Sequence, residues 1–463
     1  MPDWRPALLA AAFALGPAAC GPKVAGQRVY AAAVERVYRG EFRAAVRDLT
    51  ALLRDDPRNP RAYYLRGMAH LQLKNFGQAV ADLGRAADLD PGLQGARYQI
   101  GVARLELGDP LGALADLDAA LKIRPDAPEI LYQRAEALRS LGLSKRAEAS
   151  LDRALSLKAG FHAALVSRGY IRLRRDDLGA ARADFERATR LRPADSQGYV
   201  GRARVLRAWG RREDLDLAAR DLDTALKLSP GNVELYAVRA GVHLDRYDFD
   251  AAVADFSAAI RFNPRNADLH MSRGRVYRDM AVADRDDVRL AAAEGDLSRA
   301  IEIAPKLRPA YFFRGNVRDL RGDSKGGLED RETILRLQPK DPAGFSGLCS
   351  YYCDQQRYAD AVRNCDRAIE LWPRYADPLR LRCRARRLQG RYADGLKDCD
   401  AAVEYAPFWD DAYFERGLVH QGRKDYPRAL TDLETASRIN PRSKAVAEAL
   451  ADLRKRFGPG GKR

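Results

Sequence analysis

Apolar residues recur along this chain every three or four positions, and short polar turns, often with glycine, interrupt them. This spacing predicts α-helices with one apolar face, because residues three, four and seven apart lie on the same side of a helix. Prolines end the helical segments at nearly constant intervals, and Ala159 takes the place of one of them. The prolines stand at positions 57, 91, 125, 193, 230, 264, 305, 339, 373, 407 and 441. The pattern predicts about twelve repeated units.

Each unit has two halves with different small-residue patterns. The first half carries a small residue at one fixed place, for example Gly67 and Gly101, and the second half carries two alanines seven apart, for example Ala79 and Ala86. Small residues on one face allow a neighbouring helix to approach closely. We therefore expect a helix hairpin of 34 residues in each unit, with units filling residues 24–441 and ending near 57, 91, 125, 159, 193, 230, 264, 305, 339, 373, 407 and 441.

Two units are longer than the others. Seven extra residues around 281–292 correspond to about two helical turns at 3.6 residues per turn, and we expect one turn to be added to each helix of that hairpin. Three extra residues around 211–217 are expected to enlarge the turn instead. In the ninth unit, Gly327, Arg331 and Ile334 occupy places usually held by alanine, a large apolar residue and alanine, so this hairpin should pack least well.

Two charged columns follow the same period. Because arginines and aspartates at these places would face each other between the two helices of a hairpin, we expect an ion-pair ladder that makes the arginines structural. The arginines precede the small column at Arg66, Arg134, Arg168, Arg202, Arg239, Arg273, Arg314, Arg382 and Arg416, and the aspartates of the second helix are Asp48, Asp82, Asp116, Asp184, Asp221, Asp255, Asp296, Asp330, Asp398 and Asp432.

The small column, the paired alanines and the closing proline on a 34-residue period resemble the tetratricopeptide repeat, over about nine tenths of the chain. The resemblance implies an all-α fold: a right-handed α-α superhelix, or solenoid, of about twelve stacked hairpins whose first helices line a concave groove. Residues 442–457 resemble the C-terminal capping helix that covers the last apolar face of such arrays. Residues 458–463 are expected to form a disordered tail.

The first 22 residues differ from the repeats. One arginine precedes a short apolar run at 7–15, and small residues then lead to Cys20. The segment resembles the secretory signal of a bacterial lipoprotein, in which Cys20 would be lipidated after cleavage. Pro17 and Asp3 depart from that pattern, and an uncleaved N-terminal helix or a misplaced start is the alternative. We expect an exported protein, periplasmic or membrane-anchored, with a cytoplasmic location as the alternative.

The resemblance also indicates which residues would face the groove. Aromatic and apolar candidates suit capture of a peptide or protein, and arginine clusters suit an acidic segment. Two alternatives stay open: the apolar residues simply cover neighbouring helices, and the arginines form an ordinary mixed surface with nearby Asp245, Asp279, Asp319 and Asp354. The candidates are Tyr64, Met68, Tyr98, Val102, Tyr132, Arg204, Arg207, Arg275, Arg278, Arg380, Arg384 and Arg387.

Little in the sequence indicates catalysis. It has no HExxH, no glycine-rich phosphate loop and no nucleophile elbow, and three of its five histidines, His70, His243 and His420, share one place in the repeat, as packing residues would. We therefore expect a noncatalytic protein-protein interaction scaffold without cofactor, metal or small-molecule substrate. The net charge of +16 makes an RNA-binding helical repeat one alternative, although many arginines have acidic neighbours. A docking or regulatory subunit of a separate enzyme is another.

Five further cysteines lie in one region. Cys349 and Cys383 occupy the small column, and Cys365 and Cys399 occupy the large apolar column of the second helix. We expect them to act as small buried hydrophobic residues, since the short paired spacings of a zinc site are missing. Disulfide bonds remain open for an exported protein.

Overall fold

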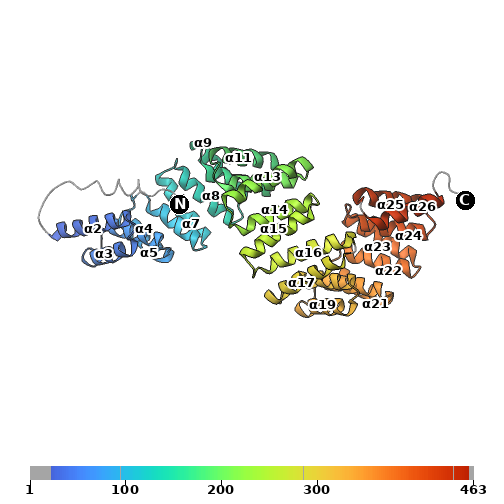
Figure 1. Ribbon diagram of the computed structural model, residues 1–463. Helices are drawn as coiled ribbons and strands as arrows, with labels where there is room; N and C mark the ends of the chain where they lie inside the picture. The colour runs from blue at the N-terminus through green and yellow to red at the C-terminus, as the bar shows by residue number, and fades with distance from the viewer. Residues whose placement is uncertain (1–21, 94, 285, 442, 458–463) are drawn as a thin grey trace. The chain divides into compact units, whose positions relative to one another are not determined.

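The structure is a computed structural model that describes residues 22–93, 95–284, 286–441 and 443–457. These residues form 25 helices, and no strand occurs among them (Figure 1). Helices α2 to α25 pair into twelve hairpins, and α26 follows the last of them. The all-α hairpin fold is therefore confirmed. The segment 1–21, which includes Cys20, and the tail 458–463 lie outside the described residues.

Even labels mark the first helix of each hairpin. These helices are α2 (Pro22–Tyr38), α4 (Pro60–Gln72), α6 (Ala96–Glu106), α8 (Pro128–Ser140), α10 (His162–Arg174), α12 (Ser196–Trp209), α14 (Val233–Asp245), α16 (Ala267–Asp284), α18 (Arg308–Leu320), α20 (Pro342–Asp354), α22 (Ala376–Leu388) and α24 (Asp410–Gly422).

Odd labels mark the second helix of each hairpin. These helices are α3 (Phe42–Asp55), α5 (Phe76–Leu89), α7 (Pro110–Ile123), α9 (Ser144–Leu157), α11 (Leu178–Leu191), α13 (Arg212–Leu228), α15 (Phe249–Phe262), α17 (Asp287–Ile303), α19 (Ser324–Leu337), α21 (Tyr358–Leu371), α23 (Tyr392–Tyr405) and α25 (Tyr426–Ile439). The last helix, α26, spans Lys444–Phe457, where the sequence predicted a capping helix.

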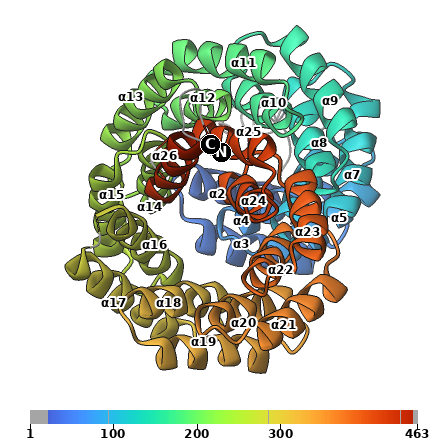
Figure 2. The ribbon, with the colours of Figure 1, turned by 90° about the vertical axis from the view of Figure 1, so that its right-hand side faces the viewer.

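The hairpins form two compact units, divided after Pro230, one of the expected unit ends. Unit 1 holds α2 to α13, and unit 2 holds α14 to α26. Within each unit, first helices of neighbouring hairpins contact each other, as α4 and α6 do in unit 1 and α22 and α24 do in unit 2. Contacts between consecutive second helices are weaker or absent among the described residues. The first helices therefore line the inner side of each unit, and the second helices lie outside them (Figure 2).

The two helices of a hairpin approach closely at the small column. A β-carbon added to Gly67 would lie only 2.7 Å from Cγ of Leu83 on the second helix, so the leucine packs directly on the glycine backbone. Ala79 and Ala86 are fully buried on the same helix as Leu83. Such close packing explains why small residues alternate with one large apolar residue in the repeat.

The predicted arginine–aspartate ladder is present. Arg202 on α12 donates two hydrogen bonds, at 2.7 Å and 2.6 Å, to the two oxygens of Asp221 on α13. The aspartate is 7% exposed, so its charge is neutralised inside the hairpin by a bidentate partner. The same pairing joins Arg66 to Asp82, Arg168 to Asp184, Arg239 to Asp255, Arg273 to Asp296, Arg314 to Asp330, Arg382 to Asp398 and Arg416 to Asp432.

Most of these arginines also bind the preceding hairpin. Nη1 of Arg382 lies 2.6 Å from Asp366 on α21, while the rest of its guanidinium holds Asp398 on α23. Asp366 stands 16 residues before Arg382, and Asp398 stands 16 residues after it. The same arrangement binds Arg66 to Thr50, Arg168 to Asp152, Arg273 to Ser257, Arg314 to Ser298 and Arg416 to Asp400.

Four hairpins depart from the ladder. In the first, Arg36 binds Asp48 from another place on α2, and in the tenth the two ladder places hold Leu348 and Asn364. The third lacks the arginine, and Asp116 is held instead by Arg97 and Arg104 from other places on α6. In the fourth, Arg134 meets Ser150 where aspartate is usual and takes Asp118 of the preceding hairpin as its charged partner. The buried carboxylate of Asp116 thus still has cationic partners, as the desolvation cost of a buried charge requires.

The two long hairpins, α12/α13 and α16/α17, differ in how they accommodate their extra residues. Helices α16 and α17 have 18 and 17 residues, which confirms that the insertion at 281–292 lengthens both helices. The expectation for 211–217 is wrong, because these residues extend α13 to 17 residues instead of enlarging the turn. Glu213 and Asp214 suit the positive end of the helix, and Leu215, 4% exposed, continues its buried face.

The ninth hairpin buries an arginine where nine of the others bury leucine or phenylalanine and two bury cysteine. Arg331 on α19 is 3% exposed and donates hydrogen bonds to Asp319 and Asn316 on α18. Its Nε and Nη1 have no acceptor within the described part of the chain. Burial raises the pKa of Asp319, against the opposing effect of Arg331. These unsatisfied donors agree with the expectation that this hairpin packs least well.

Candidate functional site

Three tyrosines occupy the same place on the consecutive first helices α4, α6 and α8 of unit 1. Tyr64, Tyr98 and Tyr132 have half-buried rings, and the ring of Tyr132 lies 5.3 Å from that of Phe161. Burial raises the pKa of Tyr64, and it raises the pKa of Tyr98 and Tyr132 to about 12. Within the described residues, no hydrogen bond holds the three hydroxyls. The rings therefore cover neighbouring helices.

The apolar candidates beside these tyrosines differ in accessibility. Met68 is 4% exposed and packs in a cluster with Leu83 and Ile100, so it belongs to the contact between hairpins and offers almost no surface to a partner. Val102 on α6 is half-buried. The sequence could not distinguish these two residues, because both have the same place in their repeats and only the neighbouring side chains differ.

The arginine pair of α12 is engaged within unit 1. The guanidinium of Arg204 lies over the ring of Tyr170 on α10, with 5.7 Å to the ring centre. Arg204 and Arg207 both make further interactions inside the protein. This pair thus combines a cation–π contact with other contacts, and its role in partner binding stays a prediction.

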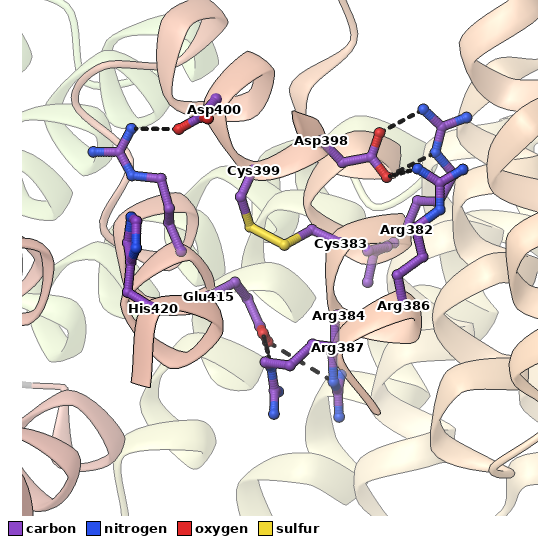
Figure 3. Close-up of a disulfide and its surroundings, with 12 residues drawn as sticks. Arg382, Cys383, Arg384, Arg386, Arg387, Asp398, Cys399, Asp400, Glu415 and His420 are labelled. Carbon is purple, nitrogen blue, oxygen red and sulfur yellow. Dashed lines mark hydrogen bonds and ion pairs between the residues drawn. A yellow bond between two sulfur atoms is a disulfide. The ribbon is translucent and has the colours of Figure 1, made fainter. Parts of the chain in front are cut away.

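The arginines of α22 are neutralised by acidic residues of their own unit (Figure 3). Arg384 lies 3.1 Å from Asp354 on α20, and Arg387 lies 3.0 Å from Glu415 on α24. Arg380, on the same helix, lies 2.8 Å from Asp377. Glu415 is only 5% exposed, so the network links three neighbouring first helices and leaves few donors for an acidic partner.

The arginine pair of α16 has a different environment. The guanidinium groups of Arg275 and Arg278 lie 4.6 Å and 4.9 Å from the ring centre of Phe313 on α18. Arg278 is also bound by its neighbour Asp279, at 2.9 Å and 2.5 Å. Arg275 is exposed and meets no carboxylate within the described residues. Its charge is therefore held in place by an aromatic ring and is left uncompensated.

Four stretches of the sequence match a family model described as tetratricopeptide repeat, at residues 30–93, 98–160, 207–267 and 350–412. Together they span more than half of the chain. The chain belongs to the tetratricopeptide repeat family. Tetratricopeptide repeat proteins are typically noncatalytic scaffolds for protein interactions, which agrees with the resemblance found in the sequence. A comparison with curated proteins found no match.

A comparison with solved structures also found similar chains. Yeast Tom70 has 16% identity and a TM-score of 0.49, with coverage of 95% of this chain and 98% of that chain. A tetratricopeptide repeat protein from Parabacteroides merdae has 16% identity and a TM-score of 0.47, covering 56% and 98%. A chain of the APC/C hetero-tetramer Cut9–Hcn1 has 15% identity and a TM-score of 0.44, covering 92% and 96%. These likenesses concern the fold alone.

Three histidines of the array lie beside the aspartates of the ladder. His70, His243 and His420 place Nε2 3.9 Å, 3.7 Å and 3.9 Å from a carboxylate oxygen of Asp82, Asp255 and Asp432. Burial lowers the pKa of all three histidines and outweighs the attraction of the aspartates. Since they share one place in the repeat and the same neighbour, they belong to its packing.

Four of the five described cysteines form disulfide bonds. Cys349 is bonded to Cys365 and Cys383 to Cys399, each joining the first and second helices of one hairpin across 16 residues (Figure 3). The bonded pairs occupy the places of Gly67 and Leu83, which touch in the second hairpin. The expectation of buried thiols is therefore corrected for these four, because the two columns lie in direct contact. Cys353 is a free, buried thiol, and burial raises its pKa to about 11.

Neither a metal centre nor a membrane span was found in the described part of the array. No group of three or more histidine, cysteine or acidic side chains there is arranged to hold a metal ion. No helix among the same residues is long and apolar enough to cross a bilayer.

Proposed function

We propose that this protein is a noncatalytic scaffold that holds an acidic segment of a protein partner against its first helices. We further propose that it works outside the cytoplasm, in the bacterial cell envelope. The array supplies preformed helices, so binding orders mainly the partner and not the scaffold. Attachment of a separate enzyme through the same surface, as a docking subunit, is included in this proposal.

The uncompensated Arg275 carries the first part of the proposal. A guanidinium stacked on Phe313 keeps its in-plane N–H donors free while its position is fixed. Such a group can bind a carboxylate with two parallel hydrogen bonds and little loss of side-chain entropy. The paired arginines of α22 lack this property, because Asp354, Glu415 and Asp377 already occupy their donors.

Two disulfide bonds support the location. Disulfides persist in oxidising compartments and are rare where glutathione and thioredoxin keep thiols reduced. The signal-like segment 1–22 favours the same compartment on independent grounds. An exported location also disfavours RNA as the partner, and most arginines that suggested RNA are engaged in the ladder.

Charge reversal of Arg275 should weaken acidic-peptide binding. A random peptide library selected on the purified protein is expected to enrich sequences rich in aspartate and glutamate, and Arg275→Glu should weaken the selected peptides at least about tenfold, as loss of a charge-assisted contact does. The affinity is measured by fluorescence polarisation with a labelled peptide.

Arg299→Glu provides the matched control for the same charge change. Arg299 lies on α17, a second helix, and its only described ion pair is with Glu302 on the same helix. This variant should retain peptide binding. Selection of the same peptides by wild type and Arg275→Glu, or enrichment without acidic residues, would show that Arg275 does not determine the partner.

The proposed membrane tether is tested at Cys20. In bacterial cells expressing the full chain, wild type is expected in the membrane fraction, and Cys20→Ala should move it to the soluble fraction because no lipid can be attached. Immunoblotting of the fractions measures the shift. An unchanged distribution of Cys20→Ala would exclude lipidation as the anchor without affecting the peptide-binding result.

A further inference from the structure

A row of cations follows the repeat-ending prolines of unit 2. The residue directly after the proline is Arg265, Lys306, Lys340 and Arg374 in four successive turns. All four side chains are exposed, and none of them forms an ion pair with a carboxylate of the described residues. We name these four residues the basic row. Unpaired surface cations repeated at one place of a repeat require a reason, since elsewhere in this protein most arginines are paired.

The basic row lies along one edge of unit 2. Each of these turns joins the end of a second helix to the start of the next first helix, so all of them are at the same end of the hairpins. Two exposed aromatic side chains lie at the C-terminal part of the row. Phe408, which takes the place after Pro407, is 88% exposed, and Trp372 is 53% exposed. Arg374 lies 5.9 Å from the ring centre of Tyr405, which connects the cations to the aromatic end.

Acidic residues at this edge do not cancel the row. Glu302 and Glu370 pair with Arg299 and Arg367 of their own helices. Asp341, which follows Lys340, is 4% exposed and pairs with Arg308. Three exposed carboxylates remain nearby, those of Asp268, Glu404 and Asp411. Against them stand the four cations of the basic row, together with the exposed Arg261 and Arg336 in the last turns of α15 and α19. The edge therefore keeps an excess of positive charge.

The turn itself does not demand a cation. In unit 1 the residues after the repeat-ending position include Gly92, Asp126, Gly160 and Ala194, and only Arg58 is basic. The same backbone turn thus accepts glycine, aspartate or alanine. Because the row is confined to unit 2, it is better explained by something that unit 2 binds than by the folding of the repeat.

We propose that this edge of unit 2 docks on an anionic phospholipid surface, with the basic row over the headgroups and Phe408 and Trp372 in the interfacial layer. Lysine and arginine are attracted to anionic headgroups, and aromatic residues favour the boundary between headgroups and acyl chains. Nucleic acid fits less well, because single strands bind where successive bases stack on several open aromatic rings. Trp372 already stacks on Tyr375, at 4.9 Å between ring centres, and Phe408 stands singly at the tip of a turn.

Vesicle binding by the full chain tests the proposal. The protein is expected to co-sediment with vesicles of phosphatidylcholine and phosphatidylglycerol at near-physiological salt, and not with phosphatidylcholine alone. The quadruple variant Arg265→Gln, Lys306→Gln, Lys340→Gln, Arg374→Gln should bind at least about tenfold more weakly, since each cation contributes to the attraction. Phe408→Ser should also weaken binding, and high salt should reduce it further.

A second quadruple variant controls for net charge. Arg246→Gln, Lys325→Gln, Arg423→Gln and Lys424→Gln remove four exposed cations at the turns inside hairpins, which are the opposite end of the same unit. This variant should bind like wild type. Equal loss in both quadruple variants, or no preference of wild type for phosphatidylglycerol, would overturn the proposal. Binding of a single-stranded RNA probe without vesicle binding would replace lipid by nucleic acid.

Discussion

Replacing Arg202 with methionine should lower the free energy of unfolding of the α12/α13 hairpin by about 3–5 kcal/mol. Methionine keeps much of the apolar stem of arginine but leaves Asp221 without the two donors at 2.7 Å and 2.6 Å. A carboxylate that is 7% exposed then remains buried without a partner. Hydrogen exchange of the α12 and α13 amides measures the effect locally, as a repeat array requires.

Two further variants decide whether the loss comes from the unpaired charge. Arg202→Met combined with Asp221→Leu should recover most of the stability, because removing both partners removes the buried charge. Arg299→Met breaks an exposed pair with Glu302 and should cost less than about 1 kcal/mol. A cost of that small size for Arg202→Met itself would show that the ladder contributes little energy.

Loss of the Cys349–Cys365 bond should destabilise the α20/α21 hairpin by about 3 kcal/mol, the magnitude expected for a disulfide that closes a loop of this length. The variant Cys349→Ala, Cys365→Ala and chemical reduction of wild type should have similar effects, with an additional packing loss in the alanine variant. Hydrogen exchange of α20 and α21, with and without reductant, measures the change.

The repeat itself offers a matched control. Cys349→Gly with Cys365→Leu recreates the Gly67–Leu83 contact at the same two places, so its α20/α21 hairpin should not respond to reductant. The Cys383–Cys399 bond remains in that variant, and the α22/α23 hairpin should still respond. Reductant-independent exchange of both hairpins in wild type would contradict the stabilising role of these bonds.

Much of the fold could be predicted from the sequence because the same packing problem is solved twelve times. The period, the hairpins and the ladder depend on residues within one unit, and each copy repeats the signal. The three extra residues at 211–217 could not be placed in this way, since a helix and a turn accept the same residues there. The outcome depends on whether Leu215 finds a buried place, and only the packed hairpin shows that it does.

The candidate site was harder to predict because the charged partners of its arginines come from neighbouring hairpins. Arg384 is paired through Asp354, and Arg387 through Glu415, and both acids lie about one repeat away along the chain. Arg275 differs from them only in what its neighbours supply. The disulfides show the same limit. The sequence places each cysteine in a column of the repeat, but the contact between the two columns is seen only in the packing of Gly67 against Leu83.

The double role of the ladder arginines has a consequence for shortening this protein. A fragment cut at Pro373 and beginning with α22 would keep Asp398 for Arg382 but lose Asp366, which belongs to the discarded segment. Similar cuts before α10 or α24 would remove Asp152 from Arg168 or Asp400 from Arg416. The prolines that punctuate the sequence are therefore poor places to dissect it, since most of these boundaries divide the ligands of one guanidinium.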